Sequence, residues 1–194
     1  MPTRFFLLVY RMPARPTAGR VAVWRLLRKV GGVYLQQSVC VFPDLPALHR
    51  DLAPVLERIL EGGGEYHLLP LRRLPEDEQT KLVDAFRAQS AKHYEEIIED
   101  CEVKFQKEIE FENFRENFTY EEAEEIRAEF EKIVLWFERV RQRDWFEVPE
   151  KGRAEEWLGR CQRLLEEFEA RVYTEQEEGD ARPAPRPRRR NQSG

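Results

Sequence analysis

The chain lacks the long apolar run that a membrane-spanning helix requires. Its N-terminal apolar stretch, Phe5 to Val9, ends at Tyr10 and Arg11, whereas a membrane span needs about 20 apolar residues. The stretch is also too short for the core of a secretory signal peptide. We therefore expect a soluble, cytoplasmic protein with no membrane partner.

Cysteine and histidine are scarce, and their positions argue against a disulfide framework or a metal site. Cys40, Cys101 and Cys161 lie far apart and are odd in number, which is not typical of a secreted disulfide-bonded domain. The three histidines lie on separate predicted elements, without the paired spacing that zinc sites show. We expect reduced, mostly buried thiols and no metal ion or other cofactor.

Motifs for nucleotide binding or nucleophilic catalysis are also missing. There is no Gly-x-Gly-x-x-Gly, no phosphate-binding loop and no Gly-x-Ser-x-Gly. The glycines at 62–64 follow a predicted helix and are interpreted as its end. Acid pairs such as Glu95 and Glu96 are so numerous that no pair indicates a catalytic site. We therefore expect no enzyme activity.

Charge is abundant, and its distribution along the chain is uneven. Charged residues make up 36% of the sequence, and the net charge is −5. Residues 1–75 carry eleven Lys and Arg against five Asp and Glu, whereas residues 76–178 carry sixteen against thirty-one. The last sixteen residues carry five arginines and one aspartate. A basic head and an acidic body predict different partners for the two parts.

Residues 1–75 show alternating strand-like and helix-like patterns. The continuous apolar run from Phe5 to Tyr10 is typical of a strand buried on both faces. A helix over 17–30 follows, then strands in VYLQ and SVCVFP, a second helix, and a strand in EYHLLPLRRL. This order predicts an α+β protein whose head has the ferredoxin-like βαββαβ arrangement.

From Glu76 onward the pattern is helical and acidic. A second helix of this region follows Thr119, which has the capping-box spacing with Glu122. Three helices of this length predict an antiparallel bundle or hairpin that extends the head over residues 76–176. Residues 177–194 are rich in Pro and Arg and have almost no apolar side chains, so we predict that they are disordered.

The first predicted helix has a cationic side. At 100° per residue its apolar side chains gather on one side, and Arg25, Arg28 and Lys29 lie on the other. Together with Arg11 and Arg20, these cations could contact a phosphate backbone and displace its counterions. The alternative is a solvated face whose basic residues suit the helix dipole. We predict DNA binding through these five residues.

Two aromatic residues lie close to these cations in the sequence. Trp24 is placed at the margin of the apolar side, and Tyr34 in the strand that follows. Aromatic rings beside cations can stack on nucleic-acid bases, but core packing is the commoner role at such positions. We predict that both are core residues.

The segment RVAVWRLLRKVGGVYLQQSVCVFPD, preceded by FFLLVYRMP, resembles the N-terminal domain of the chromate-resistance regulator ChrB. The similarity continues through GGGEYHLLPLR, the helix with Phe86 and the RQRDWF segment, and so covers about residues 5–176. The positions that carry the first block are Arg20, Trp24, Arg25, Leu27, Gly31, Tyr34, Leu35, Gln36, Val39 and Pro43.

The resemblance implies a transcriptional regulator of a chromate-efflux operon, with promoter DNA as its partner. The chain is more distantly similar to the middle domain of the phenylacetate-pathway repressor PaaX and, through it, to the ferredoxin-like nucleases of CRISPR adaptation. Those nucleases carry an acidic residue at the end of the first strand, where this chain has Tyr10 and Arg11. Metal-dependent cleavage therefore ranks last among the hypotheses.

Two hypotheses rank above metal-dependent cleavage. The first is a DNA-binding regulator or accessory subunit of a chromate or oxyanion-resistance operon, without catalytic activity. The second is a protein-interaction module whose helical region docks a separate sensor protein or a second copy of the chain as a homodimer. Longer ChrB proteins carry a further, sensing domain where this chain has its Arg-rich tail. The resemblance therefore implies either a stand-alone N-terminal module whose sensor is a separate polypeptide or a remnant with another role.

Overall fold

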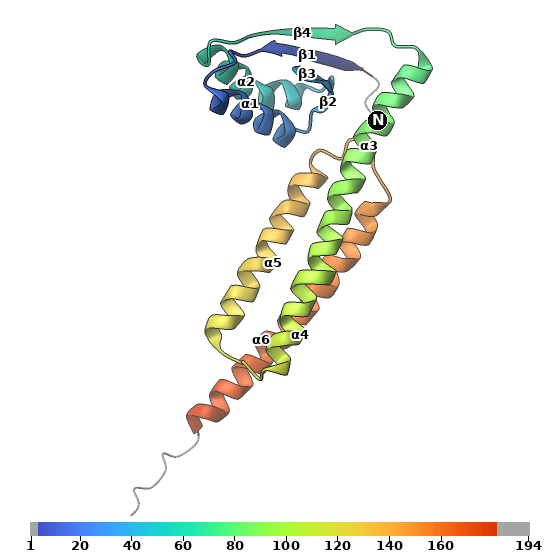
Figure 1. Cartoon of the computed structure of the whole chain (residues 1–194). Coiled ribbons are helices and arrows are strands. Elements are labelled where there is room, and N and C mark those ends of the chain that lie inside the picture. The colour runs from blue at the N-terminus through green and yellow to red at the C-terminus, as the bar shows by residue number, and fades with distance from the viewer. Residues whose placement is uncertain (1–3, 182–194) are drawn as a thin grey trace, which may run out of the picture. The chain divides into compact units, whose positions relative to one another are not determined.

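The structure is a computed structural model that describes residues 4–181 (Figure 1). It contains a four-stranded antiparallel sheet and long helices, so the predicted α+β class is confirmed. The chain forms two compact units. Among the described residues, unit 1 comprises residues 4–95 and 137–151, and unit 2 comprises residues 96–136 and 152–181. The predicted division of the chain at residues 75 and 176 stays a prediction.

Unit 1 contains the sheet, whose strands are β1 (Phe5–Arg11), β2 (Val33–Gln36), β3 (Val39–Pro43) and β4 (Glu65–Leu71). Their spatial order is β2-β3-β1-β4, and each neighbouring pair is antiparallel. β1 pairs with β4 along its whole length, from Phe5 opposite Leu71 to Arg11 opposite Glu65. The predicted succession of strand, helix, strand, strand, helix and strand is confirmed.

Two helices, α1 (Thr17–Val30) and α2 (Pro46–Glu61), cover one face of the sheet (Figure 1). Phe6 and Leu8 of β1 are buried in the same cluster as the apolar sides of both helices. Each fully buried large side chain in such a cluster stabilises the fold by about 1.5–3 kcal/mol. One side of α1 therefore packs in the core, and the other side faces solvent.

The opposite face of the sheet is covered by parts of the chain that lie much later in the sequence. Phe5 stacks on Phe86 of α3 (Glu76–Glu99) and on Phe146, with ring centroids 6.1 and 6.2 Å apart. β1 is thus buried on both faces, as its continuous apolar run predicts. The sequence pattern did not reveal that the 137–151 segment belongs to this core.

Unit 2 is helical and is built from η1 (Asp100–Phe105), α4 (Gln106–Phe114) and most of α5 (Tyr120–Arg141) and α6 (Glu150–Ala181). α5 begins as predicted: the hydroxyl of Thr119 accepts the backbone N–H of Glu122 at 3.2 Å. η1 is a π-helical turn between α3 and α4. Cys40 in unit 1 and Cys101 and Cys161 in unit 2 are free and buried, as predicted.

The C-terminal helix is longer than predicted. α6 continues to Ala181 and so includes residues 177–181 of the segment predicted to be disordered. Elongation of an existing helix adds a hydrogen bond per residue without a new nucleation cost, so charged residues can extend it past the last buried side chain. The remainder of the predicted tail, residues 182–194, lies outside the described residues. No helix within 4–181 is long and apolar enough to span a membrane.

The end of α1 offers a test of the unit 1 packing. Gly31 ends the helix at φ +99°, and a Cβ there would lie 2.8 Å from the Trp145 ring and 3.2 Å from Cβ of Arg143. Gly31→Ala is therefore expected to lower the free energy of unfolding by roughly 1–3 kcal/mol, through strain and overpacking. The measurement is denaturant unfolding, with the midpoint reduced at unchanged slope. Gly152→Ala on α6, where a Cβ meets nothing within 4 Å, is the control that should not destabilise.

Candidate nucleic-acid interface

The exposed side of α1 carries four cations. Arg20, Arg25, Arg28 and Lys29 are all exposed, and the opposite side of the helix is anchored by fully buried residues such as Leu27. The structure therefore brings the four predicted helical residues together on one solvent-facing side. They are separated by five, three and one residues, which distributes them over successive helical turns.

The fifth predicted residue, Arg11, has a different setting. It lies at the end of β1 and forms an exposed ion pair of 3.0 Å with Glu65 of β4. It lines a depression with Gly63 and Gly64 that contains none of the α1 cations. Its charge is partly offset by the carboxylate, so the α1 cations carry more of the positive potential than Arg11 does.

Trp24 is 42% exposed, so the prediction that it is a core residue is wrong. Leu27 and the other buried residues of α1 already fill the space against the sheet, and Trp24 lies one helical turn from Arg20 and from Arg28. The guanidinium of Arg28 is 5.2 Å from the Trp24 ring centroid, a cation–π contact. Arg20, Trp24 and Arg28 thus form a row along α1. In the sequence, the row is indicated by the arginines four residues before and four residues after the tryptophan.

A shallow hollow of about 560 Å³ lies beside Trp24, between α1 and the turn that joins β2 to β3. We call it the Trp24 hollow. Tyr34 is half-buried and packs against the core of unit 1, in line with its predicted core role, and its hydroxyl is 3.0 Å from that of Tyr10. The residues that line the hollow are Tyr10, Thr17, Arg20, Val21, Trp24, Tyr34, Gln36, Gln37 and Ser38.

The two tyrosines of the Trp24 hollow and the thiol beside them are held in their neutral form. Burial raises the pKa of Tyr10 and Tyr34 above the ordinary tyrosine value. Burial also raises the pKa of the neighbouring Cys40 thiol to about 12. These groups are therefore protonated at neutral pH and offer hydrogen bonds, not a nucleophile or a base.

The RQRDWF segment holds the C-terminal end of α1 in place. Nη1 of Arg143 donates to the carbonyl oxygens of Arg28 at 3.0 Å and Lys29 at 3.3 Å. The Arg28 carbonyl also accepts the backbone N–H of Gly31 at 3.0 Å, and a cation at this end of the helix is favourable. Burial lowers the pKa of Arg143, and so do the charges of Arg28 and Arg139. The RQRDWF segment therefore positions the cationic side of α1, although the two lie more than one hundred residues apart in the sequence.

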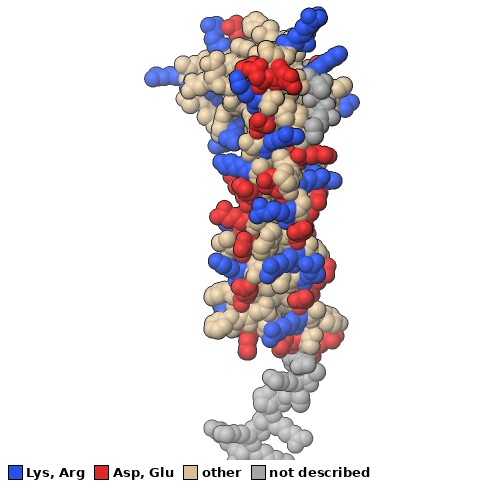
Figure 2. All heavy atoms as spheres, turned by 90° about the vertical axis from the view of Figure 1, so that its right-hand side faces the viewer, with Lys and Arg blue, Asp and Glu red and all other residues tan. Residues whose placement is uncertain are grey.

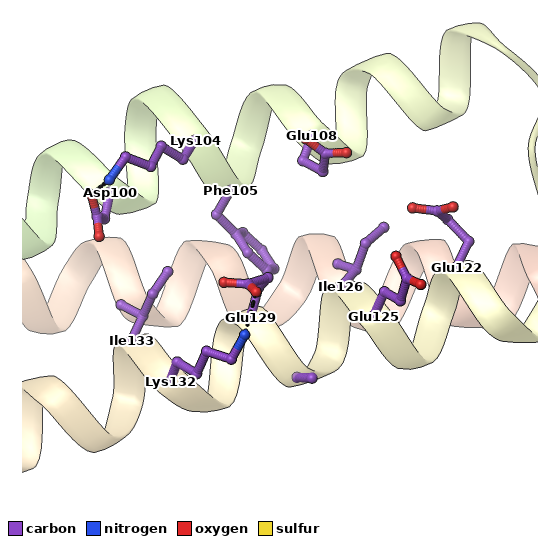
Figure 3. Close-up of a pocket in the computed structure, with 11 residues that line it drawn as sticks. Asp100, Lys104, Phe105, Glu108, Glu122, Glu125, Ile126, Glu129, Lys132 and Ile133 are labelled. Atoms are coloured by element: carbon purple, nitrogen blue, oxygen red, sulfur yellow. Dashed lines mark hydrogen bonds and ion pairs between the residues drawn. The ribbon is translucent and has the colours of Figure 1, made fainter.

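Unit 2 has a separate groove of about 450 Å³ between η1, α4 and α5 (Figure 3). Apolar side chains, Phe105, Ile126 and Ile133, lie along it, and charged side chains form its rim. On the face drawn in Figure 2, basic and acidic side chains alternate along the helical part of the chain. The charged residues of the groove are Asp100, Lys104, Glu108, Glu122, Glu125, Glu129 and Lys132, with Lys104 paired to Asp100 and Lys132 to Glu129.

Next to this groove, Glu108, Glu112 and Glu122 bring carboxylate oxygens within 4.8 Å of one another. Sequence reasoning missed this group because acid pairs are so common in the chain. Glu112 is buried and accepts hydrogen bonds from Arg115 at 3.3 Å and Asn117 at 2.6 Å, and Asn117 also donates to Glu122 at 3.1 Å. Hydrogen bonds from Arg115 and Asn117 thus offset the negative charge of Glu112 and Glu122. Among the described residues of unit 1, no group of three metal-binding side chains is found.

Crowding of these carboxylates has a consequence for stability. Burial raises the pKa of Glu122, and the charges of Glu112, Glu125 and Glu108 raise it further. A raised pKa in the folded state means that folding favours the protonated acid. The contribution of Glu122 to the free energy of unfolding is therefore fully present below pH 4.5, the ordinary pKa of this side chain. It is lost as pH rises through the pKa of Glu122 in the folded state.

Glu122→Gln is therefore expected to raise the free energy of unfolding at pH 7 by a few tenths of a kcal/mol, because a like-charge contact is removed. The stability gain should shrink as pH falls toward 4.5. Thermal or urea unfolding at pH 5 and pH 7 measures this difference. Glu124→Gln, at an exposed neighbouring position of α5, is the control, and equal effects of the two changes would contradict the crowding.

Comparison with known protein families gives a match over most of the chain. A family model described as "Protein ChrB, N-terminal" matches residues 20–179. The matched region begins at Arg20, on the cationic side of α1, and includes the RQRDWF segment that holds the end of this helix. No curated protein and no solved structure matches the chain significantly.

Proposed function

The chain belongs to the ChrB N-terminal family, and from this we propose that it is a regulatory protein of chromate resistance that binds promoter DNA and has no catalytic activity. The observation that carries the proposal is the row of exposed cations on α1, Arg20, Arg25, Arg28 and Lys29. Each cation that contacts a phosphate displaces a counterion, and this release drives binding to DNA.

The packing of α1 supports this role, because a recognition surface gains affinity when it is held rigidly. Val23 and Leu27 are fully buried against the sheet, and Arg143 binds the carbonyl groups at the helix end.

We also assign the head to the ferredoxin-like arrangement, since β1 and β3 are its central strands and both helices cover one face.

The chemistry near β1 supports a non-catalytic role. Phosphodiester cleavage with a metal ion needs carboxylate or similar ligands beside the substrate. The end of β1 carries Tyr10 and Arg11, and no acidic residue lines the Trp24 hollow. The cationic side of α1 therefore suits phosphate binding better than phosphate hydrolysis.

Titration of the protein with a labelled duplex from the promoter of its own operon tests the proposal. Saturable binding whose affinity falls steeply with salt concentration is expected. Unrelated duplex DNA of the same length is the comparison for sequence preference. Absence of binding up to roughly micromolar protein, where non-specific binding already appears for DNA-binding proteins, would reject DNA binding.

The groove of unit 2 supports a second function, docking of a protein partner. Its apolar lining is bordered by Glu108, Glu122 and Glu125, whereas the two lysines at its rim are already paired with acids. A partner helix with basic and apolar residues would complement this rim, on a separate sensor protein or on a second copy of the chain.

Sedimentation of the pure protein distinguishes these partners. A homodimer through the groove is expected to dissociate when exposed Glu108 and Glu125 are replaced by lysine, because the rim charge is reversed. A chain that sediments as a monomer at all concentrations rules out the second copy and leaves the separate sensor as the groove's partner.

A further inference from the structure

The Trp24 hollow has a composition that phosphate binding alone does not explain. A large aromatic side chain that is 42% exposed is costly to leave in water, and Trp24 lies in the middle of an otherwise cationic row. Its ring borders the hollow of about 560 Å³, a size within the range of pockets that hold small ligands. The indole of Trp24 therefore has the Arg28 guanidinium over its ring and also borders the hollow.

The polar groups of the hollow match the edges of a nucleobase. Gln36 and Gln37 offer amide groups that both donate and accept hydrogen bonds, and Ser38 adds a hydroxyl. None of the residues lining the hollow is acidic, so a polyanion is not repelled. Arg20 lies at the edge of the hollow and can hold a phosphate next to a bound base.

We propose that the Trp24 hollow binds one unpaired nucleobase of DNA, stacked on the indole of Trp24, while the α1 cations hold the adjacent phosphates. This inference rests on the proposed DNA binding and deepens it. A base inside an intact duplex is stacked and paired, so it must be released before it can enter. DNA with an unpaired base therefore binds more tightly than a continuous duplex.

Three labelled duplexes of one sequence test this: an intact duplex, a duplex with one unpaired adenine, and a duplex with an abasic nucleotide at that position. The abasic duplex keeps the extra phosphate and the local flexibility but has no base to stack. Stacking of one base on an aromatic side chain predicts roughly 10-fold tighter binding of the unpaired adenine than of either other duplex.

Trp24→Ala should abolish this preference, so that the three duplexes bind with equal affinity, and Trp24→Phe should retain part of it. Because Trp24 is exposed, both variants should keep the unfolding midpoint of the parent protein. Trp157→Ala is the matched control: Trp157 on α6 also has an arginine, Arg160, over its ring at 4.9 Å, but it lies in unit 2. This variant should keep the preference.

The outcomes separate the two proposals. Equal binding of the adenine and abasic duplexes, or an unchanged preference in Trp24→Ala, overturns the base-binding hollow while DNA binding through α1 stands. Failure of the parent protein to bind any of the three duplexes at low salt overturns both.

Discussion

Phe146→Ala is expected to lower the free energy of unfolding by about 3–5 kcal/mol, the usual cost of removing a buried phenylalanine. Phe146 is 2% exposed and packs against the rings of Phe5 and Phe86. Its loss leaves a cavity on the face of the sheet opposite α1. Urea unfolding followed by circular dichroism measures the effect, and a loss of this size is a large part of the stability of an ordinary domain.

Phe114→Ala is the matched control, since this residue has the same side chain but is 85% exposed at the end of α4. It should change the unfolding free energy by less than about 0.5 kcal/mol. Similar effects of the two changes would contradict the assignment of the 137–151 segment to the core of unit 1.

The double variant Arg25→Ala/Arg28→Ala is expected to weaken DNA binding roughly 50-fold at about 0.1 M salt. Each phosphate contact makes the affinity vary as nearly the inverse of the salt concentration, so the loss of two contacts lowers the slope of log affinity against log salt by about two. The loss should be similar for all duplex sequences, because phosphate contacts carry no sequence information. Titrations at three or more salt concentrations give both the affinity and the slope of log affinity against log salt.

Arg153→Ala/Arg163→Ala removes the same charge from exposed positions of α6 in unit 2. This control should retain the affinity and the salt slope of the parent protein. If both double variants bind alike, net charge rather than the α1 side governs binding, and the assignment of the interface fails.

The elements of the head could be predicted from the sequence because each is encoded locally. The apolar run at Phe5, the helical period from Thr17 to Val30 and the glycines after each helix all act over a few residues. The cationic side of α1 could be predicted for the same reason. The order of the strands in space depends on contacts between distant segments, and periodicity alone does not determine it.

Two features of the site could not be predicted because they depend on such distant contacts. Trp24 has the residue type of a core position, and only the packing of Val23 and Leu27 against the sheet shows that the core is full without it. Likewise, nothing near Arg143 in the sequence indicates that its guanidinium binds the end of α1, 115 residues away. The three-carboxylate group was hidden by the abundance of acids in the chain.

The dependence of unit 1 on the 137–151 segment has a consequence for biosynthesis. When the first 95 residues have left the ribosome, the sheet can form, but Phe5 has only α3 to cover it, and the last carbonyl groups of α1 still lack Arg143. The head is completed only after residues 96–136, which belong to unit 2, have been synthesised. Prematurely terminated chains would therefore expose an apolar sheet face that quality-control proteases can recognise, so that α1 accumulates only in chains that also carry the helical unit.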